Sequence, residues 1–251
     1  MRKIISLLAL LPAVALLWLT PASAASFDAQ QKKEIEALVR EYLLANPEIL
    51  REMSDNLQAK EQQAAQEARV SALTDNAKDI FKTGADPVAG NPKGDVTVVE
   101  FMDYNCGWCK KGVGEIASLI EHDKNVRVVF KEFPIFGAGS EFAARAAIAA
   151  TKQGKYWELH QALFAHDGPV TEDVTRQIAE GLGMDMKKLE ADMQDESVVK
   201  TIGTTQALAT ALQINGTPAF IVDDKVFPGY VPKSELLKAI EEVRSAGCKY
   251  C

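Results

Sequence analysis

The chain is poor in basic residues relative to acidic ones. Its 251 residues contain 28 Lys and Arg against 35 Asp and Glu, which gives a formal net charge of -7. A surface that binds nucleic acid needs a basic face to neutralise phosphates, so we expect no nucleic-acid partner. Histidine is also scarce, and we interpret His122, His160 and His166 as ordinary core or surface residues. We expect no cofactor.

Cysteine is equally sparse, with four in the whole chain. They form two Cys-x-x-Cys pairs, Cys106 with Cys109 and Cys248 with Cys251. Small domains that rely on disulfides need many more, because their cores are small. The pairs are therefore expected to serve chemistry rather than architecture. A zinc site normally needs four ligands, and only the terminal pair could complete one around the first.

A long hydrophobic run occurs at one place, near the amino terminus. Arg2 and Lys3 precede the apolar residues 4–19, and small residues follow up to Ala24. This order is typical of a secretory signal peptide, so we expect residues 1–24 to be removed by cleavage after Ala24. A retained anchor is the alternative, although the run is short for a hydrocarbon core of roughly 30 Å. Export to the periplasm would place the cysteines where disulfides persist.

Residues 27–82 contain no glycine and few strand formers, which predicts helix. A break is expected at Asn46-Pro47, where Asn can cap and Pro can start a helix. Apolar side chains form a stripe on both sides of this break. They are Ile35, Leu38, Val39, Tyr42, Ile49, Leu50, Met53 and Leu57. We expect residues 25–83 to form a helical stalk that self-associates through residues 27–70. The alternative is that the stalk folds back on the catalytic domain.

The remaining chain, residues 84–246, predicts an α/β domain. Turn formers in residues 84–95 mark its start. A helical insertion is expected at about residues 134–213, because that length far exceeds one crossover helix. The other expected elements are strands at residues 96–102, 126–133, 219–222 and 225–227, and helices at residues 110–121 and 233–245.

The first cysteine pair follows a strand and opens a helix, which is the context of a redox motif. Free N–H groups and the positive dipole end at a helix start stabilise a thiolate. We therefore expect Cys106 to be the nucleophile. Cys109, one turn further on, is placed to resolve the mixed disulfide.

Residues 98–109, the helical insertion and the segment Gly216-Thr217-Pro218-Ala219-Phe220 together resemble the DsbA family of thioredoxin-fold proteins. The resemblance implies a thioredoxin-like fold with a helical insertion, and a cis-proline at Pro218 facing the active-site disulfide. It also implies that Thr217 and Pro218 bind the substrate chain, and we add Trp108 to this surface. A plain proline at the edge of a strand is the alternative.

Glu100 resembles the acidic residue that lies beneath the active site in this family, where it can move the proton of the resolving thiol. The alternative is an exposed carboxylate at the end of its strand. Lys131 could be its charge partner, or could be a solvated lysine.

Two departures from the family pattern bear on the direction of the chemistry. Gly107-Trp108 stands where DsbA has Pro-His, so the disulfide should be less oxidising. The stalk, with residues 45–50, is similar to that of trimeric suppressor-of-copper-sensitivity C proteins (ScsC). That resemblance implies a homotrimeric disulfide isomerase, linked to copper tolerance and kept reduced by a membrane partner of the ScsB or DsbD type. The rivals are a monomeric DsbA-type oxidase and a copper-binding protein that holds Cu(I) at Cys106 and Cys109.

The tail, residues 247–251, fits no part of this pattern. Its Cys248 and Cys251 could relay electrons, close a local disulfide or bind a soft metal.

Overall fold

A computed structural model describes residues 27–82 and 84–251 of the chain. The predicted signal peptide lies outside these residues. The chain divides into two compact units between Lys60 and Glu61. This division falls inside the predicted stalk of residues 25–83. Among the described residues, no helix has the length and apolar character needed to cross a membrane.

The first unit contains the helix α1 (Ala29–Ala45) and the first part of α2 (Glu48–Asp75). Asp28 caps α1 by accepting hydrogen bonds from the N–H groups of Gln30 and Gln31, and the Asp28 N–H in turn donates to the Gln31 side-chain oxygen. This reciprocal arrangement satisfies donors that a helix start leaves free. The helix break falls at Asn46-Pro47, as the sequence predicts. No residue of α1 is buried.

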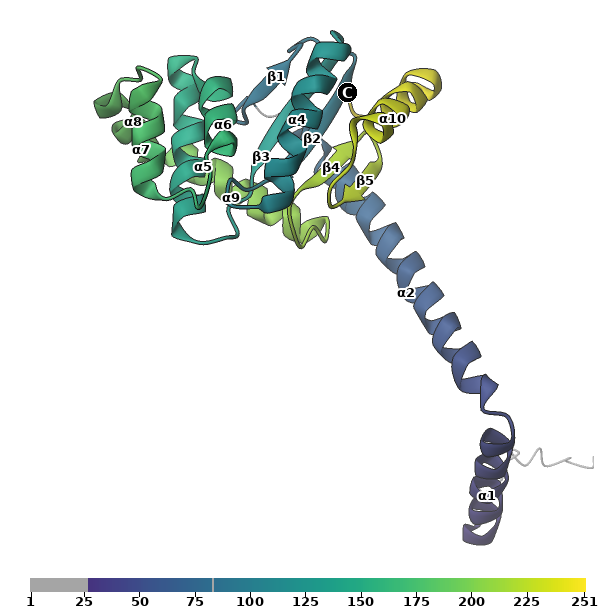
Figure 1. Ribbon diagram of the computed structural model, residues 1–251. Coiled ribbons are helices and arrows are strands. Elements are labelled where there is room, and N and C mark those ends of the chain that lie inside the picture. Colours follow the sequence, from purple (N-terminus) through teal and green to yellow (C-terminus); the bar gives the residue numbers. More distant parts are fainter. Residues whose placement is uncertain (1–26, 83) are drawn as a thin grey trace, which may run out of the picture. The chain divides into compact units, whose positions relative to one another are not determined.

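The second unit is built on a five-stranded mixed sheet in the order β1-β3-β2-β4-β5, labelled in Figure 1. The strands β2 and β3 run parallel, and every other neighbouring pair is antiparallel. The strands are β1 (Val88–Gly90), β2 (Val96–Met102), β3 (Val126–Glu132), β4 (Ala219–Val222) and β5 (Lys225–Pro228). The short strand β1 lies within residues 84–95, which the sequence indicated only as a domain boundary. The turn-forming residues on both sides of the strand outweighed its short apolar pattern.

Both faces of the sheet are covered, so every residue of β2 is buried. One face packs against α4 (Gly107–His122), α6 (Tyr156–Ala165) and α10 (Lys233–Ala246) through residues such as Val98, Phe130 and Ile240. The opposite face, with Val99 and Phe101, packs against the end of α2, the short helix α3 (Ala77–Phe81) and the end of α9 (Glu196–Ala211). Side chains alternate between these two cores along each strand.

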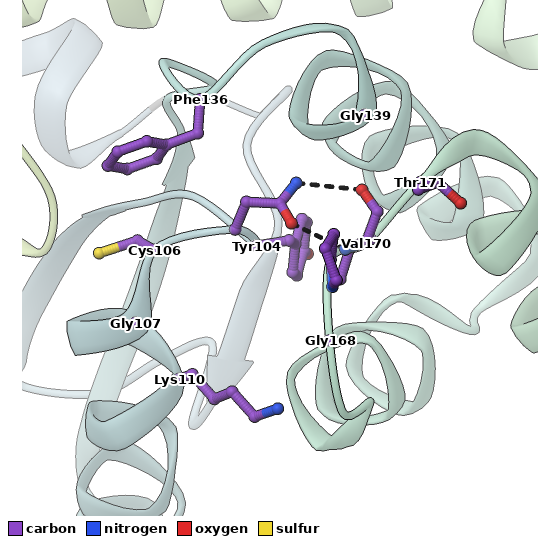
Figure 2. A pocket seen from close by; sticks show the side chains of 11 residues that line it. Tyr104, Cys106, Gly107, Lys110, Phe136, Gly139, Gly168, Val170 and Thr171 are labelled. Atoms are coloured by element: carbon purple, nitrogen blue, oxygen red, sulfur yellow. Dashed lines mark hydrogen bonds between the residues drawn. The ribbon is translucent and has the colours of Figure 1, made fainter.

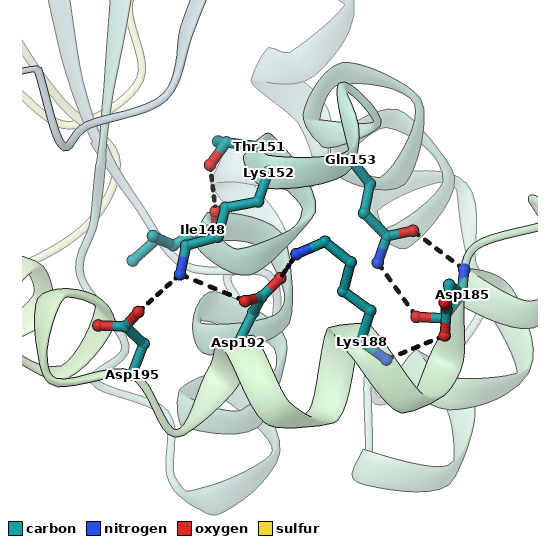
Figure 3. Close-up of polar contacts among 8 residues, drawn as sticks. All are labelled: Ile148, Thr151, Lys152, Gln153, Asp185, Lys188, Asp192 and Asp195. Carbon is teal, nitrogen blue, oxygen red and sulfur yellow. Dashed lines mark hydrogen bonds and ion pairs between the residues drawn. The ribbon is translucent and has the colours of Figure 1, made fainter.

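The insertion between β3 and β4 is helical, as predicted, and α5 runs through its centre. Small residues on α5 let its neighbours approach closely, and eight of its residues are buried. A group of polar contacts joins the 3-10 turn that follows α5 to α8 and to the start of α9 (Figure 3). The helices of the insertion are α5 (Ala138–Ala150), a 3-10 turn (Thr151–Gln153), α6, α7 (Glu172–Gly181), α8 (Met186–Met193) and α9.

Candidate active site

Cys106 is the residue that caps the start of α4. Its backbone is extended, and its Sγ accepts a hydrogen bond from the N–H of Cys109 at 3.4 Å. On its other side Cys106 Sγ lies 3.1 Å from the carbonyl oxygen of Thr217, to which it donates a hydrogen bond while it is protonated. The structure therefore brings three of the predicted site residues together, with both thiols free. The helix starts three residues earlier than the sequence predicted, because Cys106 itself serves as the cap.

The two thiols differ strongly in acidity. Hydrogen bonds from Cys109 lower the pKa of Cys106 to about 6. Burial raises the pKa of the Cys109 thiol far above its ordinary value, and the hydrogen bond to Cys106 and the nearby Glu100 add to this. Near neutral pH the first sulfur is a thiolate and the second keeps its proton. A thiolate is the attacking species in disulfide exchange, so this geometry prepares Cys106 for attack.

The loop that faces the dithiol carries Thr217 and Pro218. The Thr217–Pro218 peptide bond is cis, as the resemblance implied. Pro218 immediately precedes β4, and the pairing of β4 with β2 holds this loop beside the start of α4. The Thr217 carbonyl points at the Cys106 sulfur, so an incoming chain that reaches the sulfur also meets backbone hydrogen-bonding groups of the loop.

Glu100 lies within β2 and is 3% exposed, so the alternative of an exposed strand end is wrong. Burial, together with the Cys106 charge, raises the pKa of Glu100 to about 8. The negative charge of Glu100 also contributes to the raised pKa of the Cys109 thiol, so the two groups interact electrostatically. A carboxyl that titrates near neutral pH can both hold and release a proton there.

Lys131 is neither the charge partner of Glu100 nor a solvated lysine. In the parallel pairing of β2 and β3, Glu100 lies opposite Phe130, and Lys131 lies opposite Phe101. Successive side chains point to opposite faces of a sheet, so Glu100 and Lys131 project into different cores. Lys131 forms a buried ion pair with Asp86 and also donates to the Asp79 carbonyl.

Trp108, between the two cysteines, is 56% exposed beside the reactive sulfur. Its ring lies 5.9 Å from that of Tyr230, and the ammonium of Lys111 lies 4.8 Å above it. Tyr230 is itself held by a 3.0 Å hydrogen bond to Glu115 of α4. Trp108 therefore forms part of an exposed aromatic surface next to Cys106, which suits contact with a polypeptide substrate.

Asp103 and Asn105 organise the loop before Cys106, a role that the sequence did not reveal. Asp103 accepts hydrogen bonds from the N–H groups of Asn105, Ile135 and Phe136. The Asn105 amide bonds in both directions with the backbone of Val170, at 2.7 and 3.0 Å. Asp103 and Asn105 belong to the segment 98–109 that carries the family resemblance, but their partners beyond β3 lie far away in sequence. The pair joins the active-site loop to the helical insertion.

A pocket of about 650 Å³ opens between this loop and the insertion (Figure 2). Cys106 and Lys110 line it from the start of α4, Phe136 from the segment after β3, and Val170 from the insertion. Phe136 is 55% exposed. The Cys106 side chain therefore lines a hollow that has both polar and apolar walls and one basic side chain.

Behind the pocket lies a buried polar cluster that sequence reasoning also missed. Glu132 accepts hydrogen bonds from the hydroxyls of Tyr104 and Tyr156, and both hydroxyls also contact His160 Nδ1 at 3.2 Å. Burial raises the pKa of Glu132 well above its ordinary value and lowers the pKa of His160 to about 3. His160 is therefore neutral at pH 7. His160 is a core histidine, as the sequence predicts.

Metal-binding residues do not gather elsewhere in the described part of the chain. Within residues 27–82 and 84–251, no group of three or more His, Cys, Asp or Glu is arranged to hold an ion. The tail cysteines, Cys248 and Cys251, are joined in a disulfide. They are thus distinct from the free dithiol at Cys106 and Cys109.

Known proteins share both the sequence pattern and the fold of this chain. Residues 97–241 match the DSBA-like thioredoxin domain family, and residues 31–64 match the copper resistance protein ScsC N-terminal domain. A thioredoxin-like oxidoreductase from Silicibacter pomeroyi is 45% identical, covering 68% of this chain and 98% of its own, with a TM-score of 0.66. Proteus mirabilis ScsC in a transitional conformation is 29% identical, covering 88% of this chain and all of its own, with a TM-score of 0.66. BcfH of Salmonella enterica Typhimurium is 30% identical, covering 85% of this chain and 96% of its own, with a TM-score of 0.70.

The fold and the dithiol at the start of α4 define a thioredoxin-fold oxidoreductase. The chain belongs to the family of DsbA-like thioredoxin domains, and it carries in addition the N-terminal segment found in ScsC proteins.

Curated relatives include sodium/proton antiporters, such as that of Salinispora tropica, which is 30% identical over 142 residues. The chain spans only 22% of that relative and 27% of one from Mycobacterium. The match therefore covers a small part of each antiporter, and the antiporter names refer to the much longer whole proteins.

Proposed function

We propose that this protein is a periplasmic disulfide isomerase and reductase that acts on misoxidised proteins. The observation that supports it best is the contrast between a thiolate at Cys106, beside Thr217, and a buried, protonated thiol at Cys109. A periplasmic thioredoxin-like protein of Salmonella is 30% identical to the chain, which supports this location. The sequence signal at residues 1–24 agrees with it.

The exchange begins when the Cys106 thiolate attacks a substrate disulfide. A bond forms between Cys106 and one substrate sulfur, the substrate S–S bond breaks, and the other substrate sulfur leaves as a thiolate. In isomerisation that thiolate attacks a different sulfur, and a later substrate thiolate releases Cys106 unchanged, so no electrons are gained or lost. Trp108, Thr217 and Pro218 hold the substrate chain during these steps.

In reduction Cys109 completes the reaction. Cys106 carries no charge in the mixed disulfide, which removes one of the two causes of the raised pKa of Glu100. Glu100 in its carboxylate form takes the proton of the Cys109 thiol, and the new thiolate attacks Cys106. A Cys106–Cys109 disulfide forms, and the substrate leaves with both sulfurs reduced, having gained two electrons. A membrane partner of the ScsB or DsbD type then restores the dithiol. The position of Glu100, buried and within electrostatic reach of Cys109, supports this role.

The stalk supports an oligomer, which we propose to be a homotrimer formed through residues 27–70. Its stripe of large apolar side chains is exposed, with Leu38 at 67% and Met53 at 60%. A patch of this kind is typical of an interface. Several active sites in one assembly let one copy retain a mispaired substrate while exchange continues.

Refolding of scrambled ribonuclease by the unaltered protein and by two cysteine variants tests the proposal. We expect Cys106→Ala to abolish refolding, and Cys109→Ala to retain isomerisation while losing net reduction, because only reduction needs the second sulfur. Alkylation of Cys106 should rise with pH around a midpoint of about 6. Refolding at the normal rate by Cys106→Ala would refute the assignment. A monomeric mass together with net oxidation of reduced substrates would favour the DsbA-type oxidase instead.

A further inference from the structure

The tail disulfide between Cys248 and Cys251 plays no part in the exchange described above. It follows α10 directly, after Gly247, whose φ of +86° suits glycine. Both tail cysteines are half-buried, whereas Cys109 is fully buried. A small thiol reagent can therefore approach the tail sulfurs.

The turn between β4 and β5 holds the tail. Asp223 in this turn is 5% exposed, and its Oδ1 accepts hydrogen bonds from the N–H groups of Lys249 at 2.8 Å and Tyr250 at 2.9 Å. The Lys249 ammonium forms an ion pair with Asp224. The tail backbone must keep a tight turn for one carboxylate oxygen to accept from two successive N–H groups. The Cys248–Cys251 bond, which spans three residues, fixes that turn covalently.

Tyr250 extends from this turn to the helices that precede the sheet. Its ring stacks on that of Phe81 in α3, with centroids 5.9 Å apart and planes within 8°. Its hydroxyl shares a 2.8 Å hydrogen bond with Thr74 in the last turn of α2. The side chain also packs against the core that contains Leu73 and Phe81. The end of the chain thus covers the end of α2 and α3.

We propose that the Cys248–Cys251 disulfide is a second thiol–disulfide site, a reducible clasp that keeps Tyr250 seated on Phe81 and Thr74. A dithiol reductant opens it. One reductant thiolate attacks a tail sulfur and breaks the S–S bond, and the second reductant thiol then displaces that sulfur. The reductant becomes a disulfide, and the tail gains two thiols, two electrons and two protons. After reduction the turn is held only by its hydrogen bonds to Asp223, the Lys249–Asp224 ion pair and the contacts of Tyr250, so it opens more readily than the covalently closed turn.

Hydrogen exchange in residues 70–82 measures whether the clasp is closed. The full chain would carry Cys106→Ser and Cys109→Ser, so that only the tail can react, and would be compared before and after reduction with dithiothreitol. We expect exchange in this segment to become about tenfold faster on reduction, while exchange in the middle of α4 stays unchanged. A matched protein that also carries Cys248→Ser and Cys251→Ser should exchange fast with or without reductant.

Two substitutions at Tyr250 test the connection between the disulfide and the helices. Oxidised Tyr250→Ala should exchange as fast in residues 70–82 as the reduced protein, whereas Tyr250→Phe, which keeps the stacked ring, should lie close to the oxidised parent. The proposal fails if reduction leaves exchange in residues 70–82 unchanged. It also fails if mass spectrometry of the alkylated protein shows free tail thiols before any reductant is added. Neither result depends on the activity of Cys106.

Discussion

The stalk and the thioredoxin unit differ in which side chains they expose and which they bury. Residues 27–60 expose large apolar side chains, among them Leu44 at 70% and Leu38 at 67%. The unit from Glu61 onward buries ionisable ones, including Glu100 at 3% and Lys131 at 1% exposed. Exposed apolar area and buried charge are both unfavourable in a folded monomer. The first region thus has the exposed surface that the proposed oligomer needs, and the second contains the buried carboxyl, Glu100, that the proposed mechanism uses.

Charges placed on the stalk stripe should produce the largest effect. We expect Leu38→Glu with Met53→Glu to convert an oligomer to a monomer, because each carboxylate would have to enter an apolar seam. Isomerase activity should be lost when the assembly dissociates, while simple dithiol exchange should remain. Light scattering and the ribonuclease assay measure the two quantities. Gln58→Glu, which adds a charge at an exposed polar position nearby, is the control and should leave the mass unchanged. An unaltered mass in the double variant would contradict the trimer.

Glu100→Gln should change how stability depends on pH. The pKa of Glu100 rises from 4.5 to about 8 on folding, so between these values the folded state holds a proton that the unfolded state has lost. The free energy of unfolding therefore falls as pH increases through this window, by roughly 5 kcal/mol in total. Glutamine does not titrate, so the variant should lack this fall.

Urea denaturation at several pH values measures the effect. Both proteins should carry Cys106→Ser, because the Cys106 thiolate titrates in the same window. This substitution also removes the Cys106 charge, the smaller cause of the raised pKa of Glu100, so the fall measured is the part due to burial. If the free energies of unfolding of the two proteins change in parallel from pH 4.5 to 8, Glu100 is ionised throughout that range. That result would contradict the raised pKa of Glu100 and its ability to hold a proton near neutral pH.

Lys131→Met should destabilise the unit by about 3 to 5 kcal/mol, because it removes the ammonium that forms a buried ion pair with the Asp86 carboxylate. The pair lies in the core opposite the dithiol, so the redox chemistry of Cys106 should be little affected. Adding Asp86→Leu removes the second charge and should recover most of the loss in urea denaturation. A double variant as unstable as the single one would show that the ion pair itself is not the cause.

The contrast between Lys131 and Cys106 also shows what the sequence can predict. The sequence placed the dithiol, the proline loop and most helices and strands correctly, because strand alternation, helix starts and the spacing of Cys106 and Cys109 are local patterns. It misassigned Lys131, and it missed the roles of Asp103, Asn105 and Glu132. These side chains bond to groups on separate elements, such as Ile135, which lies 32 residues from Asp103, and Val170, which lies 65 residues from Asn105. Polar side chains buried by tertiary packing leave no periodic signal.

Lys152→Ala should have the smallest effect. The Lys152 ammonium lies 2.7 Å from Asp195 and 3.3 Å from Asp192, and Lys188 also pairs with Asp192 (Figure 3). These contacts hold the pKa of Asp192 below its ordinary value. They lie at the surface, where water and salt screen charges and ordering the side chains offsets the gain. We expect the urea midpoint to stay within measurement error of the parent. A shift as large as that of Lys131→Met would mean that surface pairs carry as much stability as buried ones, and the contrast between the two kinds of polar contact would disappear.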